Sequence, residues 1–534
     1  MKPERRRHLL AASLCLLAGL AQALSLSWPG SGQPIWWLQL LALGLLGWQL
    51  EQLVLQQDIA ASEPKHALGA RASSAWRRGA WLGWLFATAW LAGTFWWLFI
   101  SLHTYGGLPA WLAALAVPML AGVLALYYAI ACGVYVKLAP AHRALRALLF
   151  AALWLLAELA RARWFTGFGW GGIGYAHIDG LLAGYAPWLG VFGLGAMAAW
   201  LAMTLPQAWA CGPWQRVAAL AVLVWPSVWQ MEQAGEQGGY SLPAGRLEVA
   251  LLQGNIPQDE KFQSGSGVPQ ALQWYGEQLR DSTASLVVAP ETAIPLLPSQ
   301  LPEGYMQAIA ARFAQGQQAA LLGQPLGSFS EGYSNSALGF KPAQQVPWRY
   351  DKHHLVPFGE FIPPFFRWFT ELMHIPLGDF RRGSLEQPPF EWQGQRLGLN
   401  ICYEDLFGEE LALRFGDPAR APTIFVNLSN IAWFGDTVAI AQHLHITRMR
   451  ALEFERPFLR ATNTGATALV DHRGRVRAAL PAYTRGVLRA EVEGRSGLTP
   501  YARWMSQLGL WPLWLAGLAI AGLAWAARVR AEKR

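Results

Sequence analysis

Residues 397–405 read Leu397-Gly398-Leu399-Asn400-Ile401-Cys402-Tyr403-Glu404-Asp405, an apolar run that ends in a thiol and two carboxylates. The apolar part predicts a buried strand. Packing alone does not explain the two carboxylates at its end, because a carboxylate must either stay in contact with water or, if it is buried, have a hydrogen-bond donor or a cation as partner. Open α/β sheets place reactive groups where strands end. Cys402 is therefore either a small core thiol, a common fate of free cysteine, or a nucleophile at a strand tip.

Further strands are predicted on both sides of this run, with helices between them. The predicted strands are 246–253, 285–289, 319–323, 336–340, 348–352, 423–427, 458–470 and 486–492. The predicted helices are 269–279, 408–415 and 439–455. Strands of both buried and alternating type with intervening helices predict an α/β layered sandwich.

The composition separates this region from the rest of the chain. Of the 534 residues, 53% are hydrophobic, only 14% are charged and 29 are Trp, whereas soluble domains carry about 25% charged residues. The apolar excess is concentrated in about the first 230 and the last 30 residues. We therefore expect a membrane part and a soluble part.

Apolar runs long enough to form membrane helices precede and follow the soluble part. They lie near 9–28, 35–50, 80–102, 108–136, 144–160, 181–209, 216–231 and 505–527. A cleaved signal peptide is the alternative for the first run, but that run is long and others follow at once. The predicted domains are a membrane domain of about seven helices at 1–235, a catalytic domain at 245–495, and a C-terminal helix with a basic tail at 503–534.

Lys and Arg are concentrated at the two termini and in every second loop between the predicted spans. They occur at the N-terminus, around 65–78, at 137–146, at 216 and after 527, while 28–34 and 103–109 contain none. This asymmetry predicts cytoplasmic termini and a soluble domain on the opposite side of the membrane. The net charge of +8 follows largely from these loops, so no nucleic-acid partner is expected.

The cysteines also favour a reactive role for Cys402. Cys15, Cys132 and Cys211 lie in or beside apolar runs, which leaves Cys402 as the one cysteine of the soluble part. It has no disulfide partner there and no Cys-x-x-Cys spacing that would suggest zinc. A lone thiol facing an oxidising compartment is a liability unless it has a function.

Three predicted strands end in chemically potent residues, Glu291, Lys352 and Cys402. The thiolate is the attacking form of cysteine, and a free thiol is mostly protonated at neutral pH. A nearby Glu can take the proton, and a nearby Lys can lower the thiol pKa and stabilise an oxyanion. Taken singly, Glu291 and Lys352 would be read as surface charges, but the set of three is more specific than its members.

Several motifs carry a family resemblance. They are Ala289-Pro290-Glu291-Thr292-Ala293, Asp351-Lys352-His353-His354-Leu355-Val356-Pro357-Phe358-Gly359-Glu360, Cys402-Tyr403-Glu404-Asp405, Asn427-Leu428-Ser429-Asn430 and Ala432-Trp433-Phe434-Gly435. The motifs resemble the Glu-Lys-Cys motifs of the nitrilase superfamily. The spans around the domain make the whole chain similar to the membrane-embedded apolipoprotein N-acyltransferase family. The resemblance implies about eight spans plus a nitrilase-like α-β-β-α sandwich.

The same resemblance implies roles for individual residues. Glu291 would be the general base, Lys352 the cation beside the oxyanion and Cys402 the nucleophile. The implied supporting or substrate-binding residues are Glu360, Tyr403, Glu404, Phe358, Gly359, Asn427, Trp433 and Phe262. The chain departs from the family pattern at Ile431, where relatives often carry Asp, and at Phe262, where many carry Trp.

The implied reaction is acyl transfer in two half-reactions, with no cofactor and no metal. Cys402 would take an acyl chain from a phospholipid, phosphatidylethanolamine in the family, as a thioester. The α-amino group of the diacylglyceryl-cysteine of an apolipoprotein would then accept it. The implied location is the bacterial inner membrane, with the catalytic domain periplasmic. Two alternatives remain, a membrane-tethered carbon-nitrogen hydrolase using the same triad, and a non-enzymatic transporter or scaffold.

Two aromatic stretches and two histidine pairs complete the candidates. The loop 164–172 is either an interfacial aromatic belt or a docking floor or lipid entrance. The stretch 358–382 is expected to form a lid or membrane-dipping arm, with Glu360 over the site, rather than a core segment. Arg381 and Arg382 beside it are read as a solvated pair, with phosphate binding as the alternative. His353-His354 and His443-x-His445 lack a third ligand, which disfavours a metal site.

Overall fold

The computed structural model describes residues 3–61, 68–204, 212–232, 239–328, 330–362 and 380–532. The chain divides into two compact units. The first comprises Met1–Phe99, Pro109–Gly235 and Leu508–Arg534, and the second comprises Ile100–Leu108 and Glu236–Gln507.

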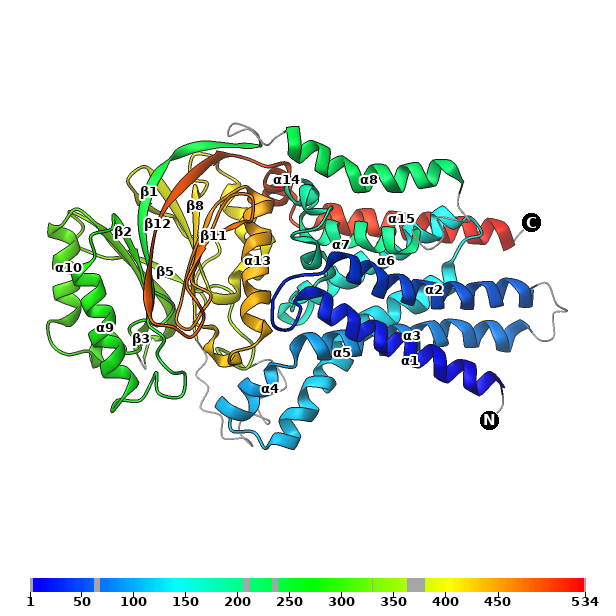
Figure 1. Cartoon of the computed structure of the whole chain (residues 1–534), viewed down its shortest axis with the longest axis horizontal. Coiled ribbons are helices and arrows are strands. Elements are labelled where there is room, and N and C mark those ends of the chain that lie inside the picture. Colours follow the sequence, from blue (N-terminus) through cyan, green and yellow to red (C-terminus); the bar gives the residue numbers. More distant parts are fainter. Residues whose placement is uncertain are drawn as a thin grey trace. The chain divides into compact units, whose positions relative to one another are not determined.

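The first unit is helical (Figure 1). Its long helices are α1 (Pro3–Leu26), α2 (Trp36–Ala61), α3 (Leu68–Phe95), α5 (Ala110–Leu138), α6 (Arg143–Arg163), α7 (Ala186–Thr204), α8 (Pro213–Glu232) and α15 (Trp511–Glu532). Among the described residues, five helices are long and apolar enough to cross a membrane, or six if the bent pair Ser74–Phe95 and Leu98–Tyr105 counts as one span. The prediction of eight spans therefore stays a prediction.

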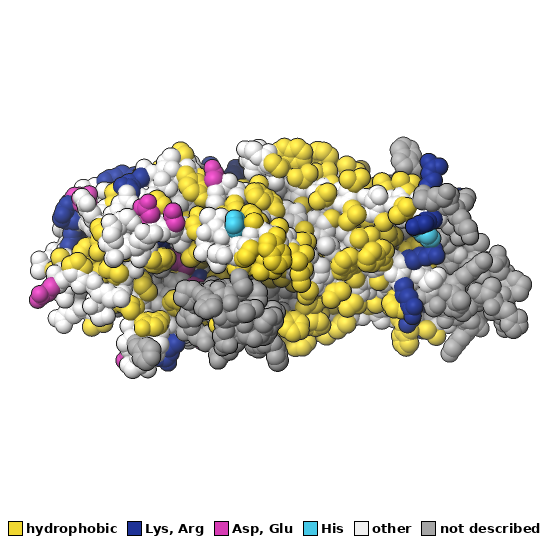
Figure 2. Space-filling model, turned by 90° about the horizontal axis from the view of Figure 1, so that it is seen from below, with side chains coloured by type: hydrophobic (Ala, Val, Ile, Leu, Met, Phe, Trp, Pro, Cys, Tyr) yellow, Lys and Arg dark blue, Asp and Glu magenta, His cyan; other side chains and the backbone are white. Residues whose placement is uncertain are grey.

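The surface of the helical unit is apolar over most of the length of its helices. Figure 2 shows hydrophobic side chains covering this face and a band of Lys and Arg at one end of it. Exposed Leu and Trp side chains are numerous on α1, α2, α5 and α15. Exposed apolar patches of this extent mark a membrane interface. The exposed basic residues at helix ends include Arg5, Arg6, Arg7, Arg77, Arg78, Lys137 and Arg143.

Charged side chains inside α6 fold the aromatic loop 164–172 back onto the helix. Arg161 donates hydrogen bonds to the carbonyl oxygens of Phe168 at 2.6 Å and Trp170 at 2.7 Å. Glu158 accepts one from the backbone N–H of Ile173 at 2.9 Å. As a result Trp170 is buried, whereas Phe165 is 91% exposed. The loop thus divides between internal packing and an exposed aromatic face.

The second unit contains two six-stranded sheets. The first has the order β12-β1-β2-β3-β4-β5, and the second β11-β10-β9-β8-β7-β6. The strands of the first are β1 (Ser241–Gln253), β2 (Leu286–Val288), β3 (Ala319–Ser328), β4 (Gly332–Phe340), β5 (Trp348–Asp351) and β12 (Gly486–Gly497). Those of the second are β6 (Phe390–Trp392), β7 (Gln395–Ile401), β8 (Ile424–Ser429), β9 (Phe458–Thr462), β10 (Ala468–Val470) and β11 (Val476–Ala479).

The two sheets face each other across a core and carry helices on their outer sides (Figure 1). Val249 and Leu286 of the first sheet pack with Leu399 and Val426 of the second. The opposite face of the first sheet packs on α9 (Gly267–Asp281) and α10 (Tyr305–Gln315). On the second sheet, Phe425 of β8 packs on Phe454 of α13 (Val438–Phe454), with ring centroids 5.8 Å apart. The predicted α-β-β-α sandwich is confirmed.

One predicted strand was wrong. The run 458–470 forms two antiparallel strands, β9 and β10, rather than one. Gly465 between them has a φ of +137°, which side chains rarely adopt. Thr462 and Thr467 close the turn through hydroxyls 3.1 Å apart. The run 458–470 was predicted as one strand because its apolar residues continue through this turn.

Parallel strands in each of the two sheets end next to candidate residues. Strands β1, β2 and β3 are parallel, as are β7, β8 and β9. Glu291 follows β2, Cys402 follows β7, and Asn430 follows β8. The carboxyl ends of parallel strands are where α/β proteins build their sites.

Candidate active site

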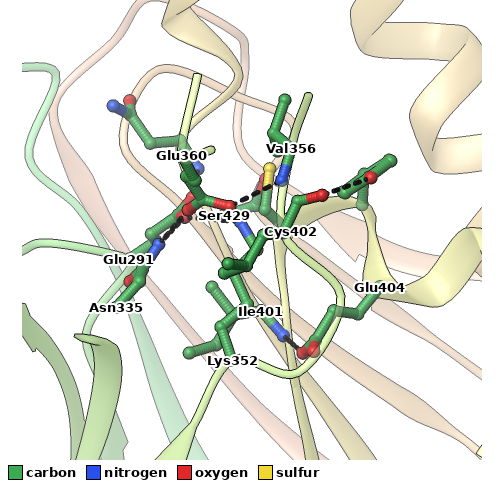
Figure 3. Close-up of polar contacts among 12 residues, drawn as sticks. Glu291, Asn335, Lys352, Val356, Glu360, Ile401, Cys402, Glu404 and Ser429 are labelled. Carbon is green, nitrogen blue, oxygen red and sulfur yellow. Dashed lines mark hydrogen bonds and ion pairs between the residues drawn. The ribbon is translucent and has the colours of Figure 1, made fainter. Parts of the chain in front are cut away.

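Cys402 occupies a sharp turn immediately after β7. Its φ of +56° lies in the left-handed region, which a residue with a side chain adopts at a cost. The turn continues as a short 3-10 helix, Cys402–Leu406. Asn427 holds it by donating to the Cys402 carbonyl oxygen at 2.7 Å, and the Ser429 hydroxyl lies 3.6 Å from Sγ (Figure 3). Backbone strain of this kind clusters at functional sites.

Glu291 is fixed on both carboxylate oxygens. Oε2 accepts a hydrogen bond from the backbone N–H of Asn430 at 2.9 Å. Oε1 accepts one from Asn335 Nδ2 at 2.7 Å and lies 3.3 Å from Lys352 Nζ. Gly323 of β3 lies under this turn, where a Cβ would come within 2.7 Å of the Glu291 Cα. Glycine at 323 therefore lets the turn approach the sheet.

Lys352 comes directly after β5 and is buried between two carboxylates. Its Nζ lies 2.9 Å from Glu360 Oε1 and 3.3 Å from Glu291 Oε1, and its side chain is 1% exposed. Burial acts to lower the pKa of Lys352, but the charges of Glu360 and Glu291 raise it well above its ordinary value. Lys352 is therefore a cation at neutral pH.

Glu360 contacts the same cluster through Lys352 and Asn335. Its Oε2 accepts a hydrogen bond from the backbone N–H of Val356 at 2.8 Å, which closes a tight loop. Phe358 within this loop has a φ of +62°. Figure 3 shows Glu291, Glu360 and Cys402 converging from three separate segments. Gly359 lies in the loop and is exposed.

Asn335 of β4 is a site residue that the sequence reasoning missed. Its Nδ2 donates to Glu291 Oε1 and Glu360 Oε1, both at 2.7 Å, and its carbonyl oxygen accepts from the backbone N–H of Lys352 at 2.8 Å. A single amide thus bridges both carboxylates that contact the lysine. The available signal was the polar triplet Ser334-Asn335-Ser336 leading into a buried strand.

Burial is the main reason that the Cys402 thiol is protonated at neutral pH. Burial, followed by the negative charge of Glu291, raises the pKa of Cys402 to about 12, although Lys352 and the Ser429 hydroxyl act to lower it. The expected lowering by lysine is therefore present but outweighed. Sulfur in this setting needs a base to remove its proton as it attacks, and Glu291 is the nearby carboxylate suited to that task.

Glu404 connects the turn of Cys402 to the segment of Lys352 through hydrogen bonds to both carboxylate oxygens. One carboxylate oxygen accepts from the backbone N–H groups of His353 at 2.7 Å and His354 at 3.0 Å. The other accepts from Ile401 N–H at 2.6 Å and the Tyr350 hydroxyl at 2.9 Å. Glu404 is thus a positioning residue, with four donors on one buried carboxylate.

Tyr403 and Asn427 also support the site through contacts with the backbone. The Tyr403 hydroxyl donates to the Leu355 carbonyl oxygen at 2.9 Å, and Lys352 Nζ lies 5.9 Å from the centre of its ring. Asn427 Nδ2 also donates to the side chain of Asn400. These contacts fix the walls of the site.

Three of the predicted supporting residues present exposed aromatic rings. Phe262 is 53% exposed, and Phe358 and Trp433 are each 40% exposed. The Tyr105 ring packs edge-on against Trp433 at 5.8 Å. Ile431, which departs from the family pattern, is buried beside Trp433 in the turn Ile431–Phe434 and fills an apolar position. Exposed aromatic rings of this kind suit contact with an apolar ligand.

The predicted arm falls mostly outside the described residues, because 363–379 are not described. Its two described ends lie together: Phe380 N–H donates to the Glu360 carbonyl oxygen at 2.9 Å. Arg381 donates to the Glu331 carbonyl oxygen at 2.6 Å, and the Arg382 guanidinium lies 5.0 Å from the centre of the Phe361 ring.

The histidines that raised the question of a metal have other partners. His354 Nδ1 lies 2.9 Å from Glu410 Oε1. His443 Nε2 lies 3.1 Å from Asp405 Oδ1, and Arg460 lies 2.6 Å from His443 Nδ1. This buried cluster underlies the Cys402–Leu406 turn, because Asp405 belongs to that turn.

Comparison with known proteins covers both regions of the chain. Residues 18–204 match the apolipoprotein N-acyltransferase N-terminal domain, and residues 248–501 match the carbon-nitrogen hydrolase domain. The chain is 55% identical over 523 residues to the apolipoprotein N-acyltransferase of Verminephrobacter eiseniae, covering 93% of this chain and 92% of that protein. It is 43% identical to that of Ralstonia nicotianae, covering 98% and 94%. The crystal structure of a Saccharomyces cerevisiae member of branch 10 of the nitrilase superfamily aligns with a TM-score of 0.35 at 16% identity, covering 47% of this chain and 91% of that one.

Proposed function

The chain belongs to the apolipoprotein N-acyltransferase family, and from this premise we propose that Cys402 carries an acyl chain from a phospholipid to an apolipoprotein. The observation that carries the proposal is that Glu291 and Lys352, which follow strands of the first sheet, lie close to Cys402, which follows a strand of the second, with Lys352 held as a cation. This set supplies a base, a positive charge and a nucleophile.

In the first half-reaction, Cys402 Sγ attacks the carbonyl carbon of the phospholipid ester. Glu291 accepts the thiol proton as the carbon–sulfur bond forms, and the Lys352 ammonium stabilises the oxyanion. The ester carbon–oxygen bond then breaks. Glu291 returns its proton to the leaving glycerol oxygen, so that a thioester and a lysophospholipid result.

In the second half-reaction, the neutral α-amino group of the diacylated apolipoprotein attacks the thioester. An α-amino group has a pKa of about 8, so it must first lose a proton to solvent. Glu291 accepts the second amine proton and passes it to the departing sulfur. An amide and the free Cys402 thiol result, and a site kept dry favours the amine over water.

Phosphatidylethanolamine is the acyl donor that we propose, together with the diacylglyceryl-cysteine of an apolipoprotein as acceptor. Both would be membrane lipids or lipid-anchored, which fits the apolar surface of the helical unit and the exposed rings of Phe262, Phe358 and Trp433. The basic helix ends support cytoplasmic termini in the inner membrane with a periplasmic catalytic domain. The domain limits 1–235, 245–495 and 503–534 remain part of this proposal.

The experiment uses the full-length enzyme in detergent with a phospholipid labelled in one acyl chain and a diacylated lipopeptide. Wild-type enzyme should transfer the label to the α-amino group of the peptide, and Cys402→Ala should not. A lipopeptide with an acetylated amino group is the control and should stay unlabelled. Release of the label to water alone would instead indicate the carbon-nitrogen hydrolase alternative, and absence of any transfer would refute the proposal.

A further inference from the structure

Lys261 is a second buried lysine beside the general base, and the mechanism above does not use it. It is 1% exposed, although the neighbouring Phe262 is 53% exposed. Its Nζ donates a hydrogen bond to the main-chain carbonyl oxygen of Glu291 at 3.1 Å. Lysine is seldom fully buried without a carboxylate partner. Here the hydrogen-bond acceptor is the backbone of a catalytic candidate.

The turn that carries Lys261 is tied into the site. Lys261 N–H donates to the Pro257 carbonyl oxygen at 2.9 Å. Gln258 in the same turn accepts a hydrogen bond from Asn430 Nδ2 at 2.8 Å, and Asn430 also binds the Glu291 carboxylate through its backbone N–H. The turn is therefore linked to Glu291 in two ways, indirectly through Asn430 and directly through the Lys261 side chain.

Close packing behind the turn keeps Lys261 in place. A Cβ at Gly267, where α9 begins, would lie 2.2 Å from the Glu260 carbonyl oxygen and 2.9 Å from the Lys261 nitrogen. The start of α9 therefore lies directly against the backbone of the turn. This packing fixes the backbone position of Lys261.

The two buried lysines differ in their charge partners. Lys352 contacts the carboxylates of Glu360 and Glu291 and stays charged. Lys261 contacts a neutral carbonyl oxygen. The charged or titratable groups that act on it are Glu291, from the turn after β2, and Cys402, from the turn after β7. Burial lowers the pKa of Lys261 to about 7, although Glu291 and Cys402 act to raise it.

We propose that Lys261 is a positioning residue of the general base, which anchors the Glu291 turn through its main-chain carbonyl oxygen and adds a positive charge close to Glu291 and Cys402. The role of Lys261 in catalysis rests on the proposed function. Its effect on the reactivity of the Cys402 thiol can be measured whether or not the proposed function is correct. When Lys261 is protonated it favours the thiolate. When Lys261 is neutral, above about pH 7, Lys352 is the remaining lysine that stabilises the thiolate.

The test measures how fast N-ethylmaleimide alkylates Cys402 between pH 6 and pH 8.5, without any lipid substrate. The full-length chain carries Cys15, Cys132 and Cys211 as alanine, so that Cys402 is the one thiol. Lys261→Met removes the charge at every pH. The rate ratio of wild type to Lys261→Met should be at least about fivefold at pH 6 and fall toward one at pH 8.5, as expected for a unit charge near a buried thiol. A lysine with a purely structural role would give the same ratio at every pH.

Lys261→Arg keeps the proposal testable if the methionine variant does not fold. Arginine stays charged throughout this range, so its rate relative to wild type should rise about fivefold from pH 6 to pH 8.5. Lys341 is the matched control, because its Nζ also donates to a main-chain carbonyl oxygen at 3.1 Å, that of Glu391, but at the surface. Lys341→Met should leave the rate unchanged.

Ratios that do not vary with pH in either Lys261 variant would overturn the inference. Acyl-enzyme formation from labelled phospholipid, measured on the same proteins, separates this result from the proposed function. Wild-type enzyme that shows the pH effect but forms no acyl-enzyme would refute the acyltransferase mechanism and leave the role of Lys261 in setting thiol reactivity intact.

Discussion

Lys352 Nζ lies 2.9 Å from Glu360 Oε1, a carboxylate only eight residues further along the chain. This is the shorter of the two ion pairs that the ammonium makes, since Glu291 Oε1 is 3.3 Å away. Most of the neutralising contact thus comes from Glu360. Glu291 shares the ammonium with Glu360 and is also held by Asn335 and the Asn430 N–H, so it keeps a fixed position beside Lys352.

Glu360→Gln should separate acyl transfer from thiol reactivity. Loss of the carboxylate leaves Lys352 paired with Glu291 alone, so acyl-enzyme formation should fall about 100-fold. Glu360 also acts to raise the pKa of Cys402, so the variant should react faster with N-ethylmaleimide. The two rates are measured on the same preparation. Glu386→Gln, at an exposed position, is the control, and a slower alkylation in Glu360→Gln would contradict the account.

Asn335→Asp should be far more damaging than its size suggests. The amide that donates to both Glu291 and Glu360 at 2.7 Å would become a third carboxylate facing two others. Like charges at such distances disfavour ionisation and repel, so acyl-enzyme formation should fall by about two orders of magnitude. The labelled-phospholipid assay measures this. Gln345→Glu makes the same chemical change at an exposed site, and equal effects in both variants would exclude a specific role for Asn335.

Glu404→Gln should reduce stability and activity together. In glutamine, an NH2 group replaces one of the two carboxylate oxygens, and each oxygen accepts from two donors. A main-chain N–H of Ile401 or His353 therefore loses its acceptor. A buried donor left without a partner costs about 1–3 kcal/mol. Thermal unfolding and acyl-enzyme formation report the two effects, with exposed Glu303→Gln as reference. Wild-type stability with no activity would instead assign Glu404 a direct chemical role.

The buried pair His443 and Asp405 should make the fold sensitive to acid. Burial and the charge of Arg460 lower the pKa of His443, although Asp405 acts to raise it. In the folded chain His443 stays neutral at a pH where the unfolded chain binds a proton, near and below about 6.5. Its contribution to stability is therefore present above about pH 6.5 and lost as the pH falls, by at most about 1.4 kcal/mol per pH unit.

Melting temperatures at pH 7.5 and pH 5 measure this effect. His443→Gln should show a smaller drop between the two pH values than wild type, while exposed His142→Gln should behave as wild type. A drop of the same size in His443→Gln would mean that other groups cause the acid sensitivity.

Strand-end reasoning from the sequence found Glu291, Lys352 and Cys402, and the structure brings these three side chains together. Glu291 and Cys402 each follow an apolar strand, where a polar residue is conspicuous, whereas Lys352 follows the mixed strand β5 and was singled out only as one of the set. Their catalytic roles stay a prediction. The sandwich was predictable from the same pattern of strands. The limit appeared at 458–470, where apolar residues continue through a turn that depends on the backbone freedom of Gly465.

Residues that act through tertiary contacts could not be found in this way. Asn335 resembles any polar residue on an alternating strand until both carboxylates are seen around its amide. Lys261 resembles a surface lysine in a turn. Glu404 was recognised from the motif, but three of its four donors belong to the segment 350–354, about 50 residues earlier in the chain. Local sequence patterns do not record such pairings.

Peptide mapping by mass spectrometry tests the central claim most directly. Full-length enzyme is incubated with phosphatidylethanolamine in the absence of acceptor, digested at mildly acidic pH, and examined at the peptide that contains Cys402. The account predicts one acyl chain on this cysteine, removed by neutral hydroxylamine and absent from Cys402→Ala. An acyl chain on a different residue, or transfer to lipopeptide without any adduct on Cys402, would contradict it.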